Sequence, residues 1–356
     1  MIPSIPPASP PVGLADPAAL VAALPVLLGF RPRDSLVLAA LCAGEGGPMR
    51  LGLTLRVDLP PPRDVDALCS AAADSLLLGD PDAAAVVVVG GADPRKRSRR
   101  RGSPAARDAG GPPRRDVAAA VVEALRARGV PSHTVVWAQR CAGGARWSCY
   151  DECGCSGLLP DPGGTALAAR AVTEGQVVYD DREDLERLVA PTSRAVLRRR
   201  EALLERSLDA ASAGAATAQA PSADDVAAAL ARVDRAVAQA ADGQLALDDT
   251  AIVALARALT LPDVRDAALR HCAGPRAAAA EQLWAALARE TPDPEAAVPA
   301  AMLAVSALLH GRGALANIAL DRAERAWPGH RLTMLLRDAA DAGVQPEEVR
   351  TWLADC

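Results

Sequence analysis

The sequence predicts an α/β domain with a mixed sheet, in two or three layers, followed by an all-helical domain of helical hairpins. Strand-like apolar runs alternate with helix-like segments up to residue 208, and only helical periodicity appears in 222–356. Between them, 209–221 is a weakly patterned Ala-rich segment that is typical of a linker. The 356 residues are enough for two domains, and 50% of them are hydrophobic, which is enough to form cores.

The α/β domain is expected to span 14–208, after a Pro-rich N-terminus at 1–13 that is predicted to be disordered. Asp16, Pro17 and Gly29 suit the N-cap, the first turn and the end of a first helix. The apolar run 35–41 and the alternating run 51–59 then predict two strands joined as a β-hairpin, which makes the sheet mixed.

Helices and strands alternate after this hairpin. Helices are expected at 64–78, 116–128, 165–173 and from Asp184 onward, and strands at 83–91, 133–139 and 176–179. Two further segments interrupt the pattern, a basic insertion at 93–115 and a Cys-rich loop at 141–157.

The second domain, 222–356, contains only helical patterns. Ser222 and Asp225 form a capping box at its first helix. Further helices are expected at 249–260, 263–272, 275–290, 295–309, 314–326, 330–341 and 346–354, and their short connections favour antiparallel pairs. Gly311, Ala316, Ala323 and Pro328 match the small residues and the proline of one tetratricopeptide-like (TPR-like) hairpin. Such helices are a candidate surface for a protein partner.

Charge and hydropathy argue against two classes of partner. The net charge of −5 lacks the basic field that nucleic-acid binding needs, and the basic run 95–101 lies in a Gly/Pro/Ser-rich loop without aromatic residues. This run is interpreted as a solvated insertion, and the role of 95–115 stays open. The longest apolar segment, 296–309, is too short to span a membrane and contains Pro299. The N-terminus lacks a positive signal-peptide region, so a cytoplasmic protein is expected. Oligomeric state stays open.

A candidate ligand-binding edge follows from the expected strand directions. If the strands at 51–59, 83–89 and 134–138 run parallel, their carboxyl ends meet at one edge of the sheet, together with the start of the strand at 35–41. The side chains and loops expected there are Arg31, Arg33, Asp34, Ser35, Arg56, Asp58, Asp93 and the Cys-rich loop.

Each piece of this edge also has a purely structural interpretation. Asp34 and Ser35 after Pro32 are ordinary turn residues, and Arg56 and Asp58, on one strand face, suit plain surface ion pairs with Arg33 and Asp34. Gly90 and Gly91 are compatible with a phosphate, but no complete phosphate-binding glycine motif follows any strand.

The Cys-rich loop carries Cys141, Cys149, Cys153 and Cys155, half of the 8 cysteines in the chain. Four thiolates are a zinc ligand set, the Cys153-Gly154-Cys155 pair suits thiol redox chemistry, and a single Cys nucleophile would need a base. The loop contains no His, and His133 stands at the far end of the preceding strand. The alternative favoured by the sequence is a structured loop whose cysteines serve as small half-buried hydrophobes.

Trp147 and Tyr150 stand beside these cysteines in a chain with few aromatic residues. Their clustering indicates a small local core or, as the second interpretation, a stacking wall for a ligand.

The segments LPVLLGFRPRDSLVLAAL, LTLRVDLP, RWSCYDECGCSG and GALANIALDRAERAWPGHRL resemble, in this order, the bacterial domain-of-unknown-function family DUF4192. The resemblance extends from about Leu20 to about Leu335 and implies a cytoplasmic protein, without an established activity. The family's loop is expected to read W-x-S-Y followed by adjacent cysteines. Here Cys149 separates Ser148 from Tyr150 and Gly154 separates Cys153 from Cys155, which weakens a fixed metal or redox role.

Three functional classes therefore remain. The first is a non-enzymatic ligand- or partner-binding regulatory protein, which the absence of a complete catalytic set in the sequence favours. The second is an enzyme that acts on a small anionic substrate with the Asp and Arg residues of the sheet edge. The third is a thiol- or zinc-dependent sensor that uses the Cys-rich loop. The cofactor is unknown, with zinc as the candidate.

Overall fold

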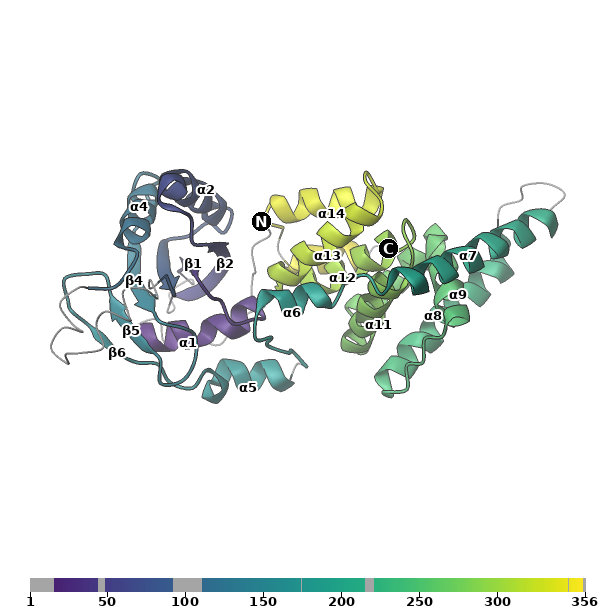
Figure 1. Cartoon of the computed structure of the whole chain (residues 1–356), viewed down its shortest axis with the longest axis horizontal. Coiled ribbons are helices and arrows are strands. Elements are labelled where there is room, and N and C mark those ends of the chain that lie inside the picture. The colour runs from purple at the N-terminus through teal and green to yellow at the C-terminus, as the bar shows by residue number, and fades with distance from the viewer. Residues whose placement is uncertain are drawn as a thin grey trace. The chain divides into compact units, whose positions relative to one another are not determined.

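The chain divides into two compact units, Met1–Arg182 and Glu183–Cys356. The computed structural model describes residues 16–43, 49–91, 111–173, 175–214, 221–344 and 346–354 (Figure 1). The sequence places the boundary after residue 208, whereas the division by contacts lies before helix α7 (Arg194–Gly214), which extends into the segment expected to be a linker. The expected disordered N-terminus, 1–13, lies outside the described residues.

The first unit is a mixed sheet with helices on both faces. Its strands are β1 (Ser35–Cys42), β2 (Arg50–Asp58), β3 (Ala83–Val89), β4 (Ser132–Ala138), β5 (Arg146–Cys149) and β6 (Ser156–Leu158). Its helices are α1 (Pro17–Leu28), α2 (Val65–Leu77), α4 (Arg115–Arg126) and α5 (Ala166–Thr173), with short 3-10 turns η1 (Pro62–Asp64) and η3 (Pro162–Gly164). The expected α/β class is confirmed, in its three-layer form.

The strand order is β2-β1-β3-β4-β5-β6. Strand β1 pairs antiparallel with β2 on one side and with β3 on the other, while β3 and β4 are parallel. Strands β2, β3 and β4 therefore point the same way, as the sequence analysis assumed. Ser35 at the start of β1 lies opposite both Asp58 and Val89, so the carboxyl ends of β2 and β3 meet there.

Two local expectations were wrong. The segment 141–157 is not only a loop, because it contains β5 and β6, which extend the sheet beyond β4 with antiparallel pairing. The expected strand at 176–179 is reduced to a single bridge between Tyr179 and Phe30. In both places the outcome depends on pairing with a strand or residue that is distant in sequence, which periodicity does not reveal.

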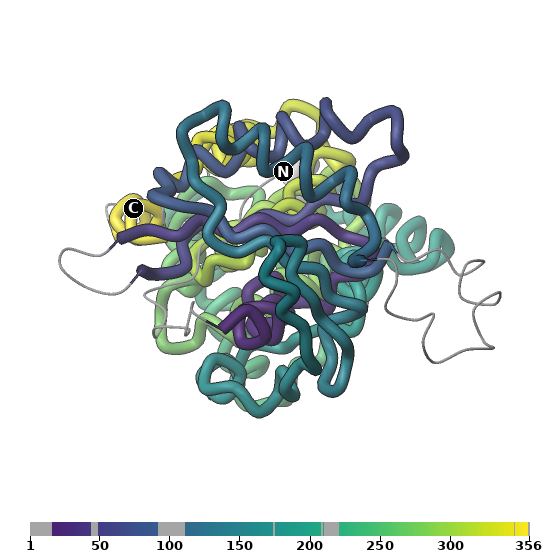
Figure 2. Tube along the Cα trace, turned by 90° about the vertical axis from the view of Figure 1, so that its left-hand side faces the viewer, coloured from purple at the N-terminus to yellow at the C-terminus, as the bar shows by residue number. Residues whose placement is uncertain are grey.

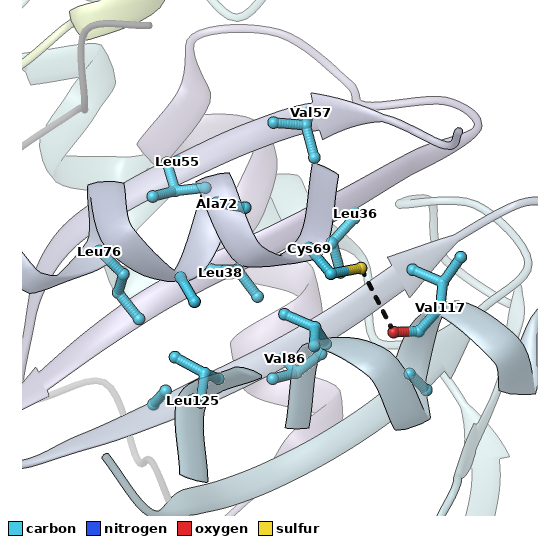
Figure 3. Packing of buried hydrophobic residues seen from close by; sticks show 14 of the residues in the cluster. Leu36, Leu38, Leu55, Val57, Cys69, Ala72, Leu76, Val86, Val117 and Leu125 are labelled. Atoms are coloured by element: carbon cyan, nitrogen blue, oxygen red, sulfur yellow. Dashed lines mark hydrogen bonds between the residues drawn. The ribbon is translucent and has the colours of Figure 1, made fainter. Parts of the chain in front are cut away.

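The main core of this unit lies between the sheet and helices α2 and α4. Alternate residues of β1, β2 and β3 point into it, among them Leu38, Leu55 and Val86, and Figure 3 shows them facing Leu76 of α2 and Leu125 of α4. Helix α1 packs on the opposite face, against β2 and β4, so that the strands run between α1 and the pair α2 and α4 (Figure 2). Strand β1 has both faces covered, which explains its continuous apolar sequence.

The second unit contains helices in all of its described elements, which confirms the expected all-α class. They are α6 (Arg182–Arg187, which begins at the last residue of the first unit), α7, α8 (Ala223–Ala241), α9 (Asp249–Thr260), α10 (Pro262–Leu269), the 3-10 turn η4 (Arg270–Cys272), α11 (Ala277–Glu290), α12 (Ala297–Leu309), α13 (Gly313–Ala326), α14 (Arg331–Asp341) and α15 (Pro346–Ala354).

Helix α12 is the centre of this unit, since every one of its residues is buried. It packs against α11, α13, α14 and α15, which explains why it is apolar on all sides. Within the described residues, no helix is both long and apolar enough to cross a membrane. Helices α12 and α13 form the pair expected to be TPR-like; Gly311 makes the turn with φ +66°, and Ala316 and Ala323 are buried.

A charged cluster fixes α7 to α9 and α11. The buried Arg200 donates from Nε to Asp249 at 2.8 Å and from Nη1 to the Glu290 carbonyl at 2.7 Å, and Arg199 also pairs with Asp249. These guanidinium groups, Arg199 first, lower the pKa of Asp249 to about 2. Asp249 is the only carboxylate in the described residues that binds both of these arginines.

We predict that Asp249→Asn lowers the thermal midpoint of the protein at pH 7. Because the pKa of Asp249 is about 2 in the folded chain and about 4 in an unfolded one, its stabilisation is present above pH 4. It is lost as the pH falls from about 4 to about 2, so wild type and variant should converge there. Calorimetry from pH 7 to pH 2.5 checks this, with Asp242→Asn, an exposed residue, as the control. A constant difference down to pH 2.5 would contradict the assignment.

Candidate functional site

The sheet edge at the start of β1 does bring together several of the residues expected there. Asp34, Ser35, Arg56 and Asp58 meet at this edge, because Ser35 is opposite Asp58 and Val37 is opposite Arg56. Gly90 follows β3 at the same edge and its N–H donates to Ala138 O of β4 at 2.9 Å. Asp93 lies outside the described residues, as does most of the basic insertion 93–115.

Asp34 joins the ends of three strands. Its backbone is left-handed, with φ +41°, and its carbonyl accepts from the N–H of Leu59, after β2, at 2.8 Å. Its Oδ1 accepts from the N–H of Gly91, after β3, at 2.7 Å. A Cβ at Gly90 would lie 2.5 Å from Asp34 Oδ1, so glycine is needed for this approach.

The backbone groups of the glycine pair are therefore already used inside the protein. The Gly90 N–H and the Gly91 N–H have the acceptors given above, and the Gly90 carbonyl accepts from Trp137 Nε1 at 2.8 Å. A phosphate cradle needs N–H groups that point at the ligand. Gly90 and Gly91 therefore have a structural role at this edge.

Arg56 is similarly engaged. Its Nε donates to Ser35 Oγ at 2.7 Å, its Nη2 lies 2.5 Å from Asp58 Oδ1, and its guanidinium stacks over the Phe30 ring at 5.8 Å from the centroid. Ser35 is fully buried and itself donates to the Arg33 carbonyl at 2.6 Å. The Arg56 guanidinium is therefore held by partners within the protein at this edge.

Arg31 and Arg33 lie at the outer margin of this edge. The Arg31 N–H donates to Tyr179 O at 3.0 Å, and its Nε lies 3.7 Å from Asp180 Oδ1. The Arg33 side chain is exposed. Burial raises the pKa of Cys141 to about 12, and the positive charge of Arg31 opposes this in part.

The Cys-rich segment is a small two-stranded extension of the sheet. Strands β5 and β6 pair Trp147 with Gly157 and Ser148 with Ser156. One further step in this register places Cys149 opposite Cys155, and the Cys149 N–H donates to the Cys155 carbonyl at 2.8 Å. Opposite residues of an antiparallel pair project to the same face. Cys149 and Cys155 are therefore cross-strand neighbours.

The turn between these strands adds the third thiol. Cys153 stands two residues before Cys155, with Gly154 between them in the left-handed conformation, φ +65°. The Cys155 N–H donates to Cys153 Sγ at 3.4 Å. As a result the Sγ atoms of Cys149, Cys153 and Cys155 all lie within 4.8 Å of one another. We call these three residues the thiol cluster.

The three thiols are not equivalent. Hydrogen bonds from the Cys155 side chain and N–H, with a further one from Cys149, lower the pKa of Cys153. The pKa values of the other two thiols are raised. Burial, followed by the hydrogen bond with Cys153, raises the pKa of Cys149 to about 12, and the hydrogen bond with Cys153 raises the pKa of Cys155. Cys153 and Cys155 are exposed and Cys149 is half-buried. Cys153 is thus the first thiol of the cluster to lose its proton.

Cys141 does not belong to the thiol cluster. It follows the carboxyl end of β4 and is buried, whereas β5 runs back along β4 and leaves Cys149 opposite Val136. The N–H of Tyr150 reaches still further back, to Val135 O at 2.9 Å. The four-sulfur set that the sequence left open as an alternative is therefore reduced to three, and the strand register places these three away from the edge with Asp34 and Asp58.

The two aromatic residues of this segment support its backbone. A Cβ at Gly157 would lie 3.0 Å from Trp147 Nε1, so the indole covers the glycine opposite it. Tyr150 packs on the main core and its OH donates to Pro113 O at 2.6 Å. Their places agree with the local-core interpretation.

The facing positions of Cys149 and Cys155, which bring the thiols together, were not predicted from the sequence. The signal that could have revealed it is the pattern R-W-S-C, then a turn with Gly154, then C-S-G-L, in which Cys149 and Cys155 occupy mirrored positions of a hairpin. The spacing alone does not tell which residues are opposite, because one step in register moves every side chain to the other face.

We predict that Asp34→Ala destabilises the protein by about 1–2 kcal/mol. Alanine removes the acceptor for the Gly91 N–H and is strained at positive φ, a loss comparable to that of a helix cap. Asp34→Asn, which keeps an acceptor oxygen and tolerates this conformation, is the matched control and should lose less than half as much. Urea unfolding measures both; equal losses would show that the side-chain bond contributes little.

We predict that iodoacetamide at pH 7.5 modifies Cys153 first, at least about tenfold faster than Cys149, because reactivity follows the thiolate fraction. The buried thiols, Cys69, Cys141 and Cys272, should react only after denaturation. Timed alkylation with peptide mass spectrometry checks the order. Modification of Cys149 before Cys153 would refute the hydrogen-bond arrangement of the thiol cluster.

Comparison with known proteins adds the family but no activity. No curated protein and no solved structure matches the chain significantly. The model of one family, described as "Domain of unknown function (DUF4192)", matches residues 17–347. That match covers both units and nearly the whole sequence, including the sheet edge and the thiol cluster. The chain belongs to the DUF4192 family.

Proposed function

We propose that this chain is a non-enzymatic regulatory protein that binds a thiophilic metal or metalloid ion through Cys149, Cys153 and Cys155. The observation that carries the proposal is the position of three Sγ atoms within 4.8 Å of one another. Thiolates are soft ligands that select soft ions, and the cluster contains no carboxylate or imidazole.

The distances suit a single ion. With metal–sulfur bonds of about 2.3 Å, two sulfur ligands of one ion lie about 4 Å apart. The Sγ atoms of the thiol cluster, within 4.8 Å of one another, are close to that spacing. The backbone N–H of Cys155 already donates to Cys153 Sγ, and such bonds favour the thiolate form that binds an ion.

From the sequence alone, the thiol- or zinc-dependent sensor was the third of the three functional classes. The geometry of the site supports it more strongly than the enzyme alternative. Ser35, Arg56 and Asp58 have internal partners at the sheet edge, and Asp34 holds the Gly91 N–H. The alternative of an enzyme that acts on an anionic substrate at this edge therefore has less support. The thiol cluster, in contrast, is exposed on two of its three residues.

In this proposal the all-helical unit contacts the protein partner that receives the signal. Support comes from large apolar side chains that are exposed there, Trp327, Met334 and Leu335. A TPR-like role for the α12–α13 hairpin is part of the same proposal.

We predict that protein purified without oxygen or chelator takes up about one equivalent of cadmium or cobalt, with a sulfur-to-metal absorption band. Replacement of Cys149, Cys153 or Cys155 by Ser should each weaken binding at least about tenfold, since each removes one of three ligands. Cys141→Ser is the matched control, because Cys141 follows β4, is buried and lies outside the thiol cluster, and it should bind as wild type.

Two results would overturn the proposal. The first is wild-type protein that takes up no soft metal while all of its thiols titrate as free. The second is a metal site that Cys141→Ser abolishes as completely as Cys153→Ser. Circular dichroism of each variant separates loss of ligand from loss of fold.

A further inference from the structure

The following inference rests on the proposed function and concerns which ion the thiol cluster takes. Among the described residues, the groups that could hold a metal here are three thiols and no fourth donor. A structural zinc site is closed by four protein ligands. Trivalent arsenic and antimony, in contrast, bond to three sulfurs in a pyramid and direct a lone pair to the fourth side, so three donors complete the site.

Charge balance separates these ions. Zinc binding to three thiols follows Zn²⁺ + 3 RSH → Zn(SR)₃⁻ + 3 H⁺, which leaves a net negative complex and releases three protons. Cuprous ion would leave a doubly negative one. Arsenous acid reacts as As(OH)₃ + 3 RSH → As(SR)₃ + 3 H₂O. Three As–O bonds and three S–H bonds break, three As–S bonds and three O–H bonds of water form, no atom is oxidised, and the product is neutral.

The surroundings of the thiol cluster oppose added negative charge. Asp151 and Glu152, both exposed, lie in the turn between Cys149 and Cys153, so two carboxylates stand beside the thiols. Cys149 is also half-buried, and burial disfavours a charged thiolate there. An ion that needs three thiolates must overcome both effects, whereas the condensation with arsenous acid uses the thiols in their protonated form.

The thiol cluster is only partly buried, so its fourth side is open. Cys153 and Cys155 are exposed, so a bulky lone pair can point to solvent, and the hairpin is held by backbone bonds at Cys149 and Tyr150. The ligand atoms are thus organised before the ion arrives, while one side stays open.

We propose that Cys149, Cys153 and Cys155 form a binding site for a trivalent thiophilic metalloid of the arsenite class, held as a neutral tris-thiolate. This assigns the ion to which the protein responds.

The test uses full-length protein, reduced with a phosphine and kept without oxygen. Sodium arsenite and zinc chloride are titrated separately at pH 6.5 and 7.5, with native mass spectrometry and a free-thiol count as readouts. We expect one arsenic gained, with three hydrogens lost from the protein and three thiols protected. Arsenite affinity should change less than about threefold between the two pH values, while zinc affinity falls about 10²–10³-fold toward pH 6.5.

Matched variants sharpen the test. Asp151→Asn removes the negative charge and should raise zinc affinity a few-fold while leaving arsenite affinity unchanged. Cys155→Ser and Cys153→Ser should each weaken arsenite binding at least about tenfold and limit protection to two thiols. Cys141→Ser should bind arsenite as wild type does.

The outcomes distinguish this inference from the proposed function. Arsenite binding to three thiols with a flat pH dependence supports both. Zinc binding that is tighter than arsenite binding at pH 7.5, and that arsenite does not displace, overturns the metalloid assignment and leaves the soft-metal proposal standing. Binding of neither ion, nor of cadmium, overturns both.

Discussion

The first unit depends on the antiparallel pairing of β1 with β2 on one side and β3 on the other. Ser35–Leu41 are buried on both faces, so the burial of this strand supplies much of the hydrophobic stabilisation of the sheet. Pairing on both sides also removes β1 as an exposed edge. Because both partners run opposite to β1, β2 and β3 run the same way, and the parallel β3–β4 pair adds β4 to that set.

This arrangement explains the polar residues at the carboxyl edge. Three strand ends and the start of β1 meet there, and their backbone groups need partners when they leave the ladder. Asp34 supplies an acceptor to the Gly91 N–H and Arg56 reaches Ser35 and Asp58. The edge that resembles a ligand site is thus the place where the sheet completes its own hydrogen bonds. The thiol cluster lies instead on the β5–β6 hairpin.

The helical unit is stabilised by one fully buried helix and by a charged cluster. Helix α12 is surrounded by other helices and needs no polar face, while α7 is tied to its neighbours by Arg199, Arg200 and Asp249. The charges of this cluster are compensated, since Arg200 also reaches Glu290. Buried arginine is tolerated only with such partners. The second unit therefore combines one apolar centre with a charged clamp at α7, α9 and α11.

The sequence by itself determined the elements and their order. Periodicity placed β1, β2, β3, β4 and nearly every helix, because burial on one or both faces leaves a direct trace in the pattern of apolar residues. It also identified Asp34, Arg56 and Asp58 as neighbours. Tertiary structure alone decided that Cys149 and Cys155 are opposite each other, that Cys141 is elsewhere, and that Asp34 holds Gly91. These facts depend on strand register and on side-chain hydrogen bonds between distant segments, for which a single sequence carries no periodic signal.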